Sequence, residues 1–128
     1  MSSILVTSCT DKGPYKSEPE YQYVVSMCRV LKGYCRNPDS FSVSGDCKYG
    51  INDQLTKFVV IPFRAQNGFG GYNTDIAYFS KDVFRGTYSE YYSSSCSYDI
   101  VTKIIIADMM AANNWSHVYS AEQVNNGL

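Results

Sequence analysis

The clearest repeat of apolar positions begins shortly after Ser17 and has the period of an α-helix. Apolar side chains return every three or four residues and so share one helical face: Tyr21, Val24, Val25, Cys28 and Leu31. Ser17 and Glu20 have the spacing of a capping box, and Gly33 directly after Lys32 is a typical stop signal. The pattern predicts a helix over about 18–32 whose apolar stripe lies in a core.

From Phe41 onward the pattern changes to the alternation that is typical of strands. A first strand has apolar residues of one parity, interrupted at a candidate bulge, Gly45: Phe41, Val43, Cys47 and Tyr49. The strongest strand is 55–66, which is apolar on one face at Val59, Ile61, Phe63 and Ala65 and partly apolar on the other at Phe58 and Val60. Because Pro62 has no backbone N–H, we expect it at a sheet edge or at a bulge.

The glycine-rich stretch Asn67–Gly71 joins strand 55–66 to a second alternating segment, 72–79, and predicts a β-hairpin. Gly70 and Gly71 permit positive φ or close backbone approach, and the Asn67 side chain can hydrogen-bond the backbone two residues on. Phe69 and Tyr72 are expected to pin the turn to the sheet. The alternative function of this loop is to hold an anion or a ligand with its amides.

The pattern after residue 80 is less regular. A turn at Lys81–Asp82 is followed by an expected fourth strand over 83–92. A second helix is expected from Ser97 or Asp99 to about Ala112, with a strand as the alternative because Ile104–Ile106 is β-branched. The end of the chain, Asn125–Gly127, is expected to be loose.

Together these elements predict one α+β domain over 17–128, preceded by a flexible segment, 1–16. An N-terminal helix packs on an antiparallel sheet of about four strands, and a C-terminal helix follows. A chain of 128 residues has room for one such domain and needs no metal or disulfide to fold.

Charge and composition exclude several classes of protein. Lys and Arg number 11 against 12 Asp and Glu, which argues against a nucleic-acid partner bound on a basic face. No apolar run approaches the roughly 18 residues that span a bilayer. No phosphate-binding loop or other cofactor motif is present, so we predict no cofactor.

The segment Leu5–Cys9 resembles the end of a bacterial lipoprotein signal, in which small residues precede a lipidated cysteine. A polar, tether-like stretch follows Cys9, which makes it a candidate lipidation site and the only predicted route to a membrane. The upstream half of such a signal, with its basic residues and a core of roughly 7–15 apolar residues, is missing. The alternative is an ordinary N-terminal strand with a free cysteine.

The remaining four cysteines, Cys28, Cys35, Cys47 and Cys96, allow two disulfides in three connectivities. Disulfides belong to the periplasm or the cell exterior, whereas buried free thiols are the alternative in a reducing cell. No C-x-x-C pair is present, and a metal site that used His117 would need nearly all of the cysteines. We therefore predict no metal site.

Residues 28–79 resemble a small domain found in bacterial envelope proteins and lipoproteins. The resemblance rests on the helix end Val30–Lys32, the turn Asn37-Pro38-Asp39-Ser40, and the hairpin junction Arg64–Tyr72 with its A-x-N-x-F-G-G-Y pattern. It implies an envelope location and a helix-plus-sheet fold, with Pro38, Asn67, Gly70 and Gly71 in structural turns. It implies no activity.

An enzymatic function has weak support, because it would depend on the single histidine, His117. Ser116 is its neighbour, but adjacency alone does not make a dyad, and there is no G-x-S-x-G motif. A Cys–His dyad would use Cys96 or Cys35 and would need the fold to bring them to His117. Paired carboxylates, such as Asp75 with Asp82 or Glu90, more often keep a sheet edge soluble. We predict no catalytic residue.

Tyrosine is concentrated between residues 72 and 98, where it offers either cross-strand packing or an exposed binding surface. The candidate binding residues are Tyr72, Tyr78, Tyr88, Tyr91 and Tyr92, with Arg64 and Arg85 at the edge.

Three functions are consistent with the sequence. The first is a non-enzymatic envelope domain, periplasmic or extracellular, that binds a protein or glycan partner. The second is a self-associating structural protein, such as a phage or virus component, in the cytoplasm or a virion. The third is a small hydrolase that uses a cysteine or a carboxylate.

Overall fold

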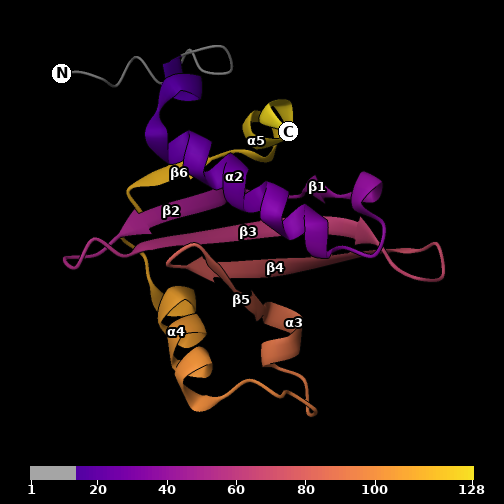
Figure 1. Cartoon of the computed structure of the whole chain (residues 1–128). Coiled ribbons are helices and arrows are strands. Elements are labelled where there is room, and N and C mark those ends of the chain that lie inside the picture. Colours follow the sequence, from indigo (N-terminus) through magenta and orange to yellow (C-terminus); the bar gives the residue numbers. More distant parts are fainter. Residues whose placement is uncertain (1–13) are drawn as a thin grey trace.

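Six strands form one antiparallel sheet in the computed structural model, which describes residues 14–128 (Figure 1). The order of the strands is β5-β4-β3-β2-β6, and β1 pairs with β3 beyond the end of β2. Their bounds are β1 Ser42–Val43, β2 Cys47–Ile51, β3 Lys57–Gln66, β4 Tyr72–Ser80, β5 Val83–Thr87 and β6 His117–Tyr119.

Helices cover both faces of this sheet and make a three-layer α+β fold, as the sequence predicts at the level of fold class (Figure 1). α2 (Pro19–Tyr34) and α5 (Ala121–Gly127) cover one face, and α4 (Ile100–Ala111) and the short α3 (Tyr88–Tyr91) lie on the other. Two 3₁₀ helices, η2 (Pro14–Ser17) and η3 (Pro38–Ser40), flank α2. Tyr15 of η2 is buried, so the packed domain includes residues ahead of the expected boundary at 17.

The main core lies between α2 and the sheet. Its fully buried members on the helix include Val24, Cys28 and Leu31, and they meet Val59 and Ile61 of β3. The helical stripe and the strand face are those that the apolar pattern predicts. The start of the helix differs, because Glu18 is the N-cap and its side chain makes no capping hydrogen bond. The predicted capping box of Ser17 with Glu20 is therefore wrong.

A second, smaller core lies on the opposite face of the same strands. Val60 of β3 and Tyr78 of β4 pack there against Ile106 and Met109 of α4. α4 begins where the sequence predicts, because the Asp99 side chain accepts a hydrogen bond from the Thr102 amide at 2.8 Å. Within the described residues, no helix is both long enough and apolar enough to cross a membrane.

Pro62 lies in the middle of β3, the central strand, so the expected edge position is wrong and the bulge is right. The Pro62 carbonyl accepts a hydrogen bond from the Ser44 amide at 3.0 Å, so it points toward the segment between β1 and β2. In an antiparallel strand the N–H and C=O of one residue point to the same side, so the missing N–H of Pro62 also belongs on that side. On that side the chain leaves the sheet between β1 and β2 at Gly45. A Cβ at Gly45 would lie 3.3 Å from the Pro62 Cβ, so the bulge fits closely over the proline ring.

The predicted hairpin of β3 and β4 is confirmed, and Gln66 pairs with Tyr72 at its end. Asn67 Oδ1 accepts from the amides of Phe69 and Gly71, and Gly70 takes a φ of +89°. Because the loop satisfies these amides itself, its geometry supports a structural turn over an anion site. Phe69 does not pin the turn to the sheet, since its side chain is 99% exposed.

The C-terminal third departs most from the prediction. The expected strand 83–92 ends at Thr87, which caps α3 by accepting from the Glu90 amide. The expected loose terminus is instead β6 followed by α5, which begins with a capping box of Ser120 and Gln123. The Asn125 side chain bonds both the N–H and the C=O of Val43, each at 2.9 Å, and so ties α5 to β1.

Asn125→Ala is therefore expected to lower the free energy of unfolding by about 1–3 kcal/mol, because two part-buried backbone groups of Val43 lose their partner. Urea denaturation followed by circular dichroism measures this change. The matched control is Asn126→Ala at the exposed neighbouring position. Equal stability of the two variants would contradict the anchoring role of Asn125.

Candidate functional site

The candidate tyrosines do not form one surface. Tyr78 is buried against α4, while Tyr88 and Tyr92 are exposed and contact each other with tilted rings, whose centroids are 4.8 Å apart. Tyr91 is half-buried and contacts Tyr92 edge-on. Three of the five therefore gather around α3, and one of the five is a core residue.

The other candidate residues lie elsewhere. Tyr72, at the start of β4, has the Arg64 guanidinium 3.9 Å from its ring centroid, a cation–π contact near the hairpin loop. Arg85 bonds the hydroxyl and the carbonyl of Ser80, so it supports the β4–β5 turn. The predicted arginine rim around one tyrosine platform is wrong.

The most apolar exposed surface is one that the tyrosine pattern did not indicate: the outer face of α4. Ile100, Val101 and Ile104 are 73%, 61% and 55% exposed. On α2, by contrast, Gln22, Ser26 and Arg29 occupy exposed positions. The sheet covers only one side of α4, so aliphatic side chains also lie on its uncovered side, next to the exposed Lys103 and Asp108.

A hollow beside α4 extends this apolar region toward the sheet. It measures about 280 Å³ and is lined by residues that include Pro62, Ile76, Tyr88, Met110 and Trp115. The Tyr92 hydroxyl lies 3.9 Å from the Met110 sulfur, which connects the exposed tyrosines to the flank of α4. We call Ile100, Val101 and Ile104, together with Tyr88 and Tyr92, the α4 face.

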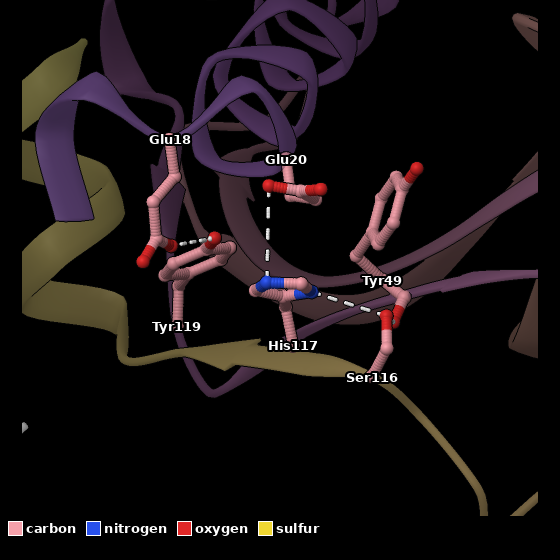
Figure 2. A network of polar contacts seen from close by, with 6 residues as sticks. All are labelled: Glu18, Glu20, Tyr49, Ser116, His117 and Tyr119. Atoms are coloured by element: carbon pink, nitrogen blue, oxygen red, sulfur yellow. Dashed lines mark hydrogen bonds and ion pairs between the residues drawn. The ribbon is translucent and has the colours of Figure 1, made fainter. Parts of the chain in front are cut away.

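A polar cluster occupies the opposite side of the sheet, where the start of α2 meets β6 (Figure 2). His117 Nε2 lies 3.8 Å from Glu20 Oε1, and their side chains are 32% and 31% exposed. The Tyr119 hydroxyl donates to Glu18 at 2.5 Å. His117 and Tyr119 are two residues apart on β6, so both face α2, and Tyr49 pairs with His117 across the ladder.

Ser116 completes this cluster. Its Oγ lies 3.1 Å from His117 Nδ1 and donates to the Tyr49 carbonyl at 3.3 Å (Figure 2). Ser116 therefore contacts His117, but its hydroxyl donates to the Tyr49 carbonyl. None of the described hollows, which lie around Trp115, Phe84 and Pro62, is lined by Ser116, His117 or Glu20. These hollows therefore offer the three residues no substrate pocket.

The sequence analysis missed Glu18, Glu20, Tyr49 and Tyr119 as site residues. Glu20 was interpreted only as part of a helix start. The one available signal was the two-residue spacing of His117 and Tyr119, which places both on one side of a strand. The sequence also did not indicate that single ligand atoms of Glu18, Glu20 and His117 all lie within 4.8 Å of one another.

The cysteines do not form the two predicted disulfides, because Cys28, Cys35, Cys47 and Cys96 are all free thiols in the structure. Cys28 and Cys47 are fully buried in the main core, and their hydrogen bond, followed by burial, raises the pKa of Cys28. Cys35 lies at the C-terminal end of α2 and Cys96 in the loop before α4. Cys9 lies outside the described residues.

The predicted Cys–His dyads are likewise absent from the described part of the chain. Cys35 follows the last residue of α2, whereas His117 contacts Glu20 in its first turn, and a helix of 16 residues is about 24 Å long. Cys96 lies on the α4 side of the sheet. Of the carboxylates, Asp75 bonds the amide of Ser89 at 3.0 Å, and Asp82 accepts from the Tyr23 hydroxyl.

Alkaline titration tests the buried position of Tyr78. Burial, followed by the charges of Tyr88, Asp75 and Tyr92, raises its pKa to about 12. A raised folded-state pKa means that the neutral phenol stabilises the fold below pH 10 and that this contribution is lost as pH rises toward 12. Tyr78→Phe should therefore lose less stability than the parent protein over this window.

Thermal melts across this pH range measure the effect, with Tyr72→Phe as the control at an exposed tyrosine. A Tyr78→Phe protein with the same alkaline loss as the parent would contradict the assignment.

Thiol accessibility tests the cysteine arrangement. Under native conditions a thiol reagent should modify Cys35 and Cys96 quickly, because both are partly exposed, whereas Cys28 and Cys47 should react only after unfolding. Peptide mass spectrometry without reductant resolves the sites. A disulfide-linked peptide from protein made in its natural host would instead support the envelope prediction.

No protein-family model matches the chain, and no similar curated protein or solved structure was found. The resemblance of residues 28–79 to envelope domains therefore stays a prediction. The function has to be inferred from the α4 face and from the polar cluster at β6.

Proposed function

We propose that this protein is a non-enzymatic interaction domain that associates with a second copy of itself through the α4 face. The observation that carries the proposal is the exposure of Ile100, Val101 and Ile104 side by side on one helix. Fully burying one such side chain is worth about 1.5–3 kcal/mol, so three of them give a strong drive toward a partner. Contiguous apolar surface of this kind is typical of protein interfaces.

The chemistry of the face favours a protein over a glycan as the partner. Its centre is aliphatic, and aliphatic side chains offer a sugar hydroxyl no hydrogen bond. Tyrosines, which interfaces favour, lie to one side at Tyr88 and Tyr92. A hollow of about 280 Å³ beside the helix, mostly apolar but with Asp46 and Lys48 in its lining, adds room for side chains of the partner.

A second copy meets these requirements without further assumptions. The exposed charged residues of α4 are Lys103 and Asp108, one of each sign, so two copies of the helix do not repel one another. A two-fold axis across Ile104 would place an aliphatic surface against an identical aliphatic surface, which is the arrangement of an isologous dimer. Assembly of this kind is the self-associating alternative that the sequence left open.

The envelope location, the lipid anchor at Cys9 and a different protein or glycan partner remain proposals of the sequence analysis. The residue of the lipid-anchor proposal, Cys9, lies outside the described part of the chain. The thiol measurement above bears on the compartment, and the next experiment bears on the partner.

Light scattering coupled to size exclusion, run over a series of loading concentrations, measures self-association. The parent protein is expected to be dimeric at high concentration and to dissociate on dilution. Ile104→Asp should raise the dimer dissociation constant at least about tenfold, since a carboxylate in an apolar contact costs more than about 1.4 kcal/mol.

The matched control is Val30→Asp, which introduces the same charge at an exposed aliphatic residue of α2. It should dimerise like the parent. Near-ultraviolet circular dichroism verifies that both variants remain folded. A parent protein that is monomeric up to its solubility limit would overturn self-association, as would equal effects of the two substitutions.

A further inference from the structure

We propose that Glu18, Glu20 and His117 form a binding site for a divalent transition-metal ion, with Zn²⁺ the best match. The site lies where the N-terminus of α2 meets β6, on the face of the sheet opposite the α4 face (Figures 1 and 2). It is independent of the proposed self-association.

The ligand atoms already converge. One oxygen of each carboxylate and one imidazole nitrogen all lie within 4.8 Å of one another, and Glu20 Oε1 is 3.8 Å from His117 Nε2. Zinc binds such nitrogens and oxygens at about 2.0–2.2 Å, so its ligands are roughly 3.3 Å apart. The Glu20 and His117 atoms have to close from 3.8 Å to this spacing, and both glutamate side chains are partly exposed.

Hydrogen bonds around His117 orient its metal-binding nitrogen. Ser116 Oγ has a single proton, which it donates to the Tyr49 carbonyl at 3.3 Å. The same oxygen lies 3.1 Å from His117 Nδ1, where it can accept the ring N–H and so leave Nε2, which faces Glu20, available to a metal ion. A histidine that donates one ring N–H and binds metal through the other nitrogen is the usual arrangement in metal sites.

A second layer of contacts holds the carboxylates. The Tyr119 hydroxyl donates to Glu18 at 2.5 Å and so fixes the position of that carboxylate. The Tyr49 ring meets the His117 ring edge-on, with ring centroids 5.8 Å apart. Among residues 14–128, His117 and Glu20 are the one basic and acidic side-chain pair within 4.0 Å, with Nε2 3.8 Å from Oε1.

The dipole of α2 does not account for this arrangement. A helix N-terminus stabilises nearby carboxylates, but Glu18 makes no capping hydrogen bond with its side chain. The dipole also gives no reason for a histidine from β6, about 100 residues away, to place its Nε2 beside the same carboxylates. A cation between the three groups satisfies all of them at once.

The ligand set selects the metal class. Imidazole favours zinc and its neighbours over magnesium and calcium, while two carboxylates and the absence of thiols disfavour copper(I). Three protein ligands leave a fourth tetrahedral position, and the partial exposure of His117 and Glu20 allows water to occupy it.

Titrations with Zn²⁺ and with Co²⁺ as a spectroscopic probe test the site in the full chain. Calorimetry is expected to show one Zn²⁺ per chain, and Co²⁺ should give the visible absorption of a tetrahedral nitrogen–oxygen site. Glu20→Gln and His117→Gln should each weaken binding at least tenfold. Tyr119→Phe, which acts through Glu18, should weaken it by about 10–100-fold.

Glu90→Gln, on the α4 side of the sheet, is the matched control and should bind as the parent does. Circular dichroism shows whether each variant is folded, and Tyr119→Phe keeps the test informative if the loss of His117 perturbs β6. Equal affinity of parent, Glu20→Gln and His117→Gln would overturn the site. So would a thiolate-to-cobalt charge-transfer band, which would place the metal on cysteines, or the absence of binding.

Discussion

Every layer of this protein depends on the two apolar faces of β3. Val59 and Ile61 are buried under α2, and Val60 between them is buried under α4. A strand that is apolar on one face needs a covering layer on that face only, whereas β3 is apolar on both faces and needs a layer of helices on each. This requirement places α2 and α4 on opposite sides of the sheet, and it makes β3 the central strand although it contains a proline.

The parts of the fold that the sequence predicts are those whose signals are local. The stripe of α2, the Asn67–Gly71 hairpin and the Asp99 cap each lie within a few consecutive residues. β6 was missed because a strand of three residues is too short for any periodicity, and it forms only because β2 offers an unpaired edge. α5 depends in turn on a distant partner, the backbone of Val43, which no local pattern reveals.

The candidate sites show the same division between local and distant information. Tyrosine density could not separate the core residue Tyr78 from the exposed Tyr88, because both fit an alternating pattern. The aliphatic residues of α4 were visible in the sequence, but their exposure follows from the single layer that covers the helix. The cluster of Glu20 with His117 joins residues almost 100 positions apart, and only the fold brings them together.

The two ends of the described chain are held together by the same region that forms this cluster. The Tyr21 hydroxyl donates to the Gln123 carbonyl at 2.7 Å, and Arg29 donates to the Gly127 carbonyl at 2.9 Å. A Cβ at Gly127 would lie 2.3 Å from the Tyr21 hydroxyl, so the last turn of α5 approaches α2 as closely as glycine allows. Any ligand that draws Glu18 and Glu20 toward His117 would therefore stabilise the first helix against the last strand, and through that contact the closure of the whole fold.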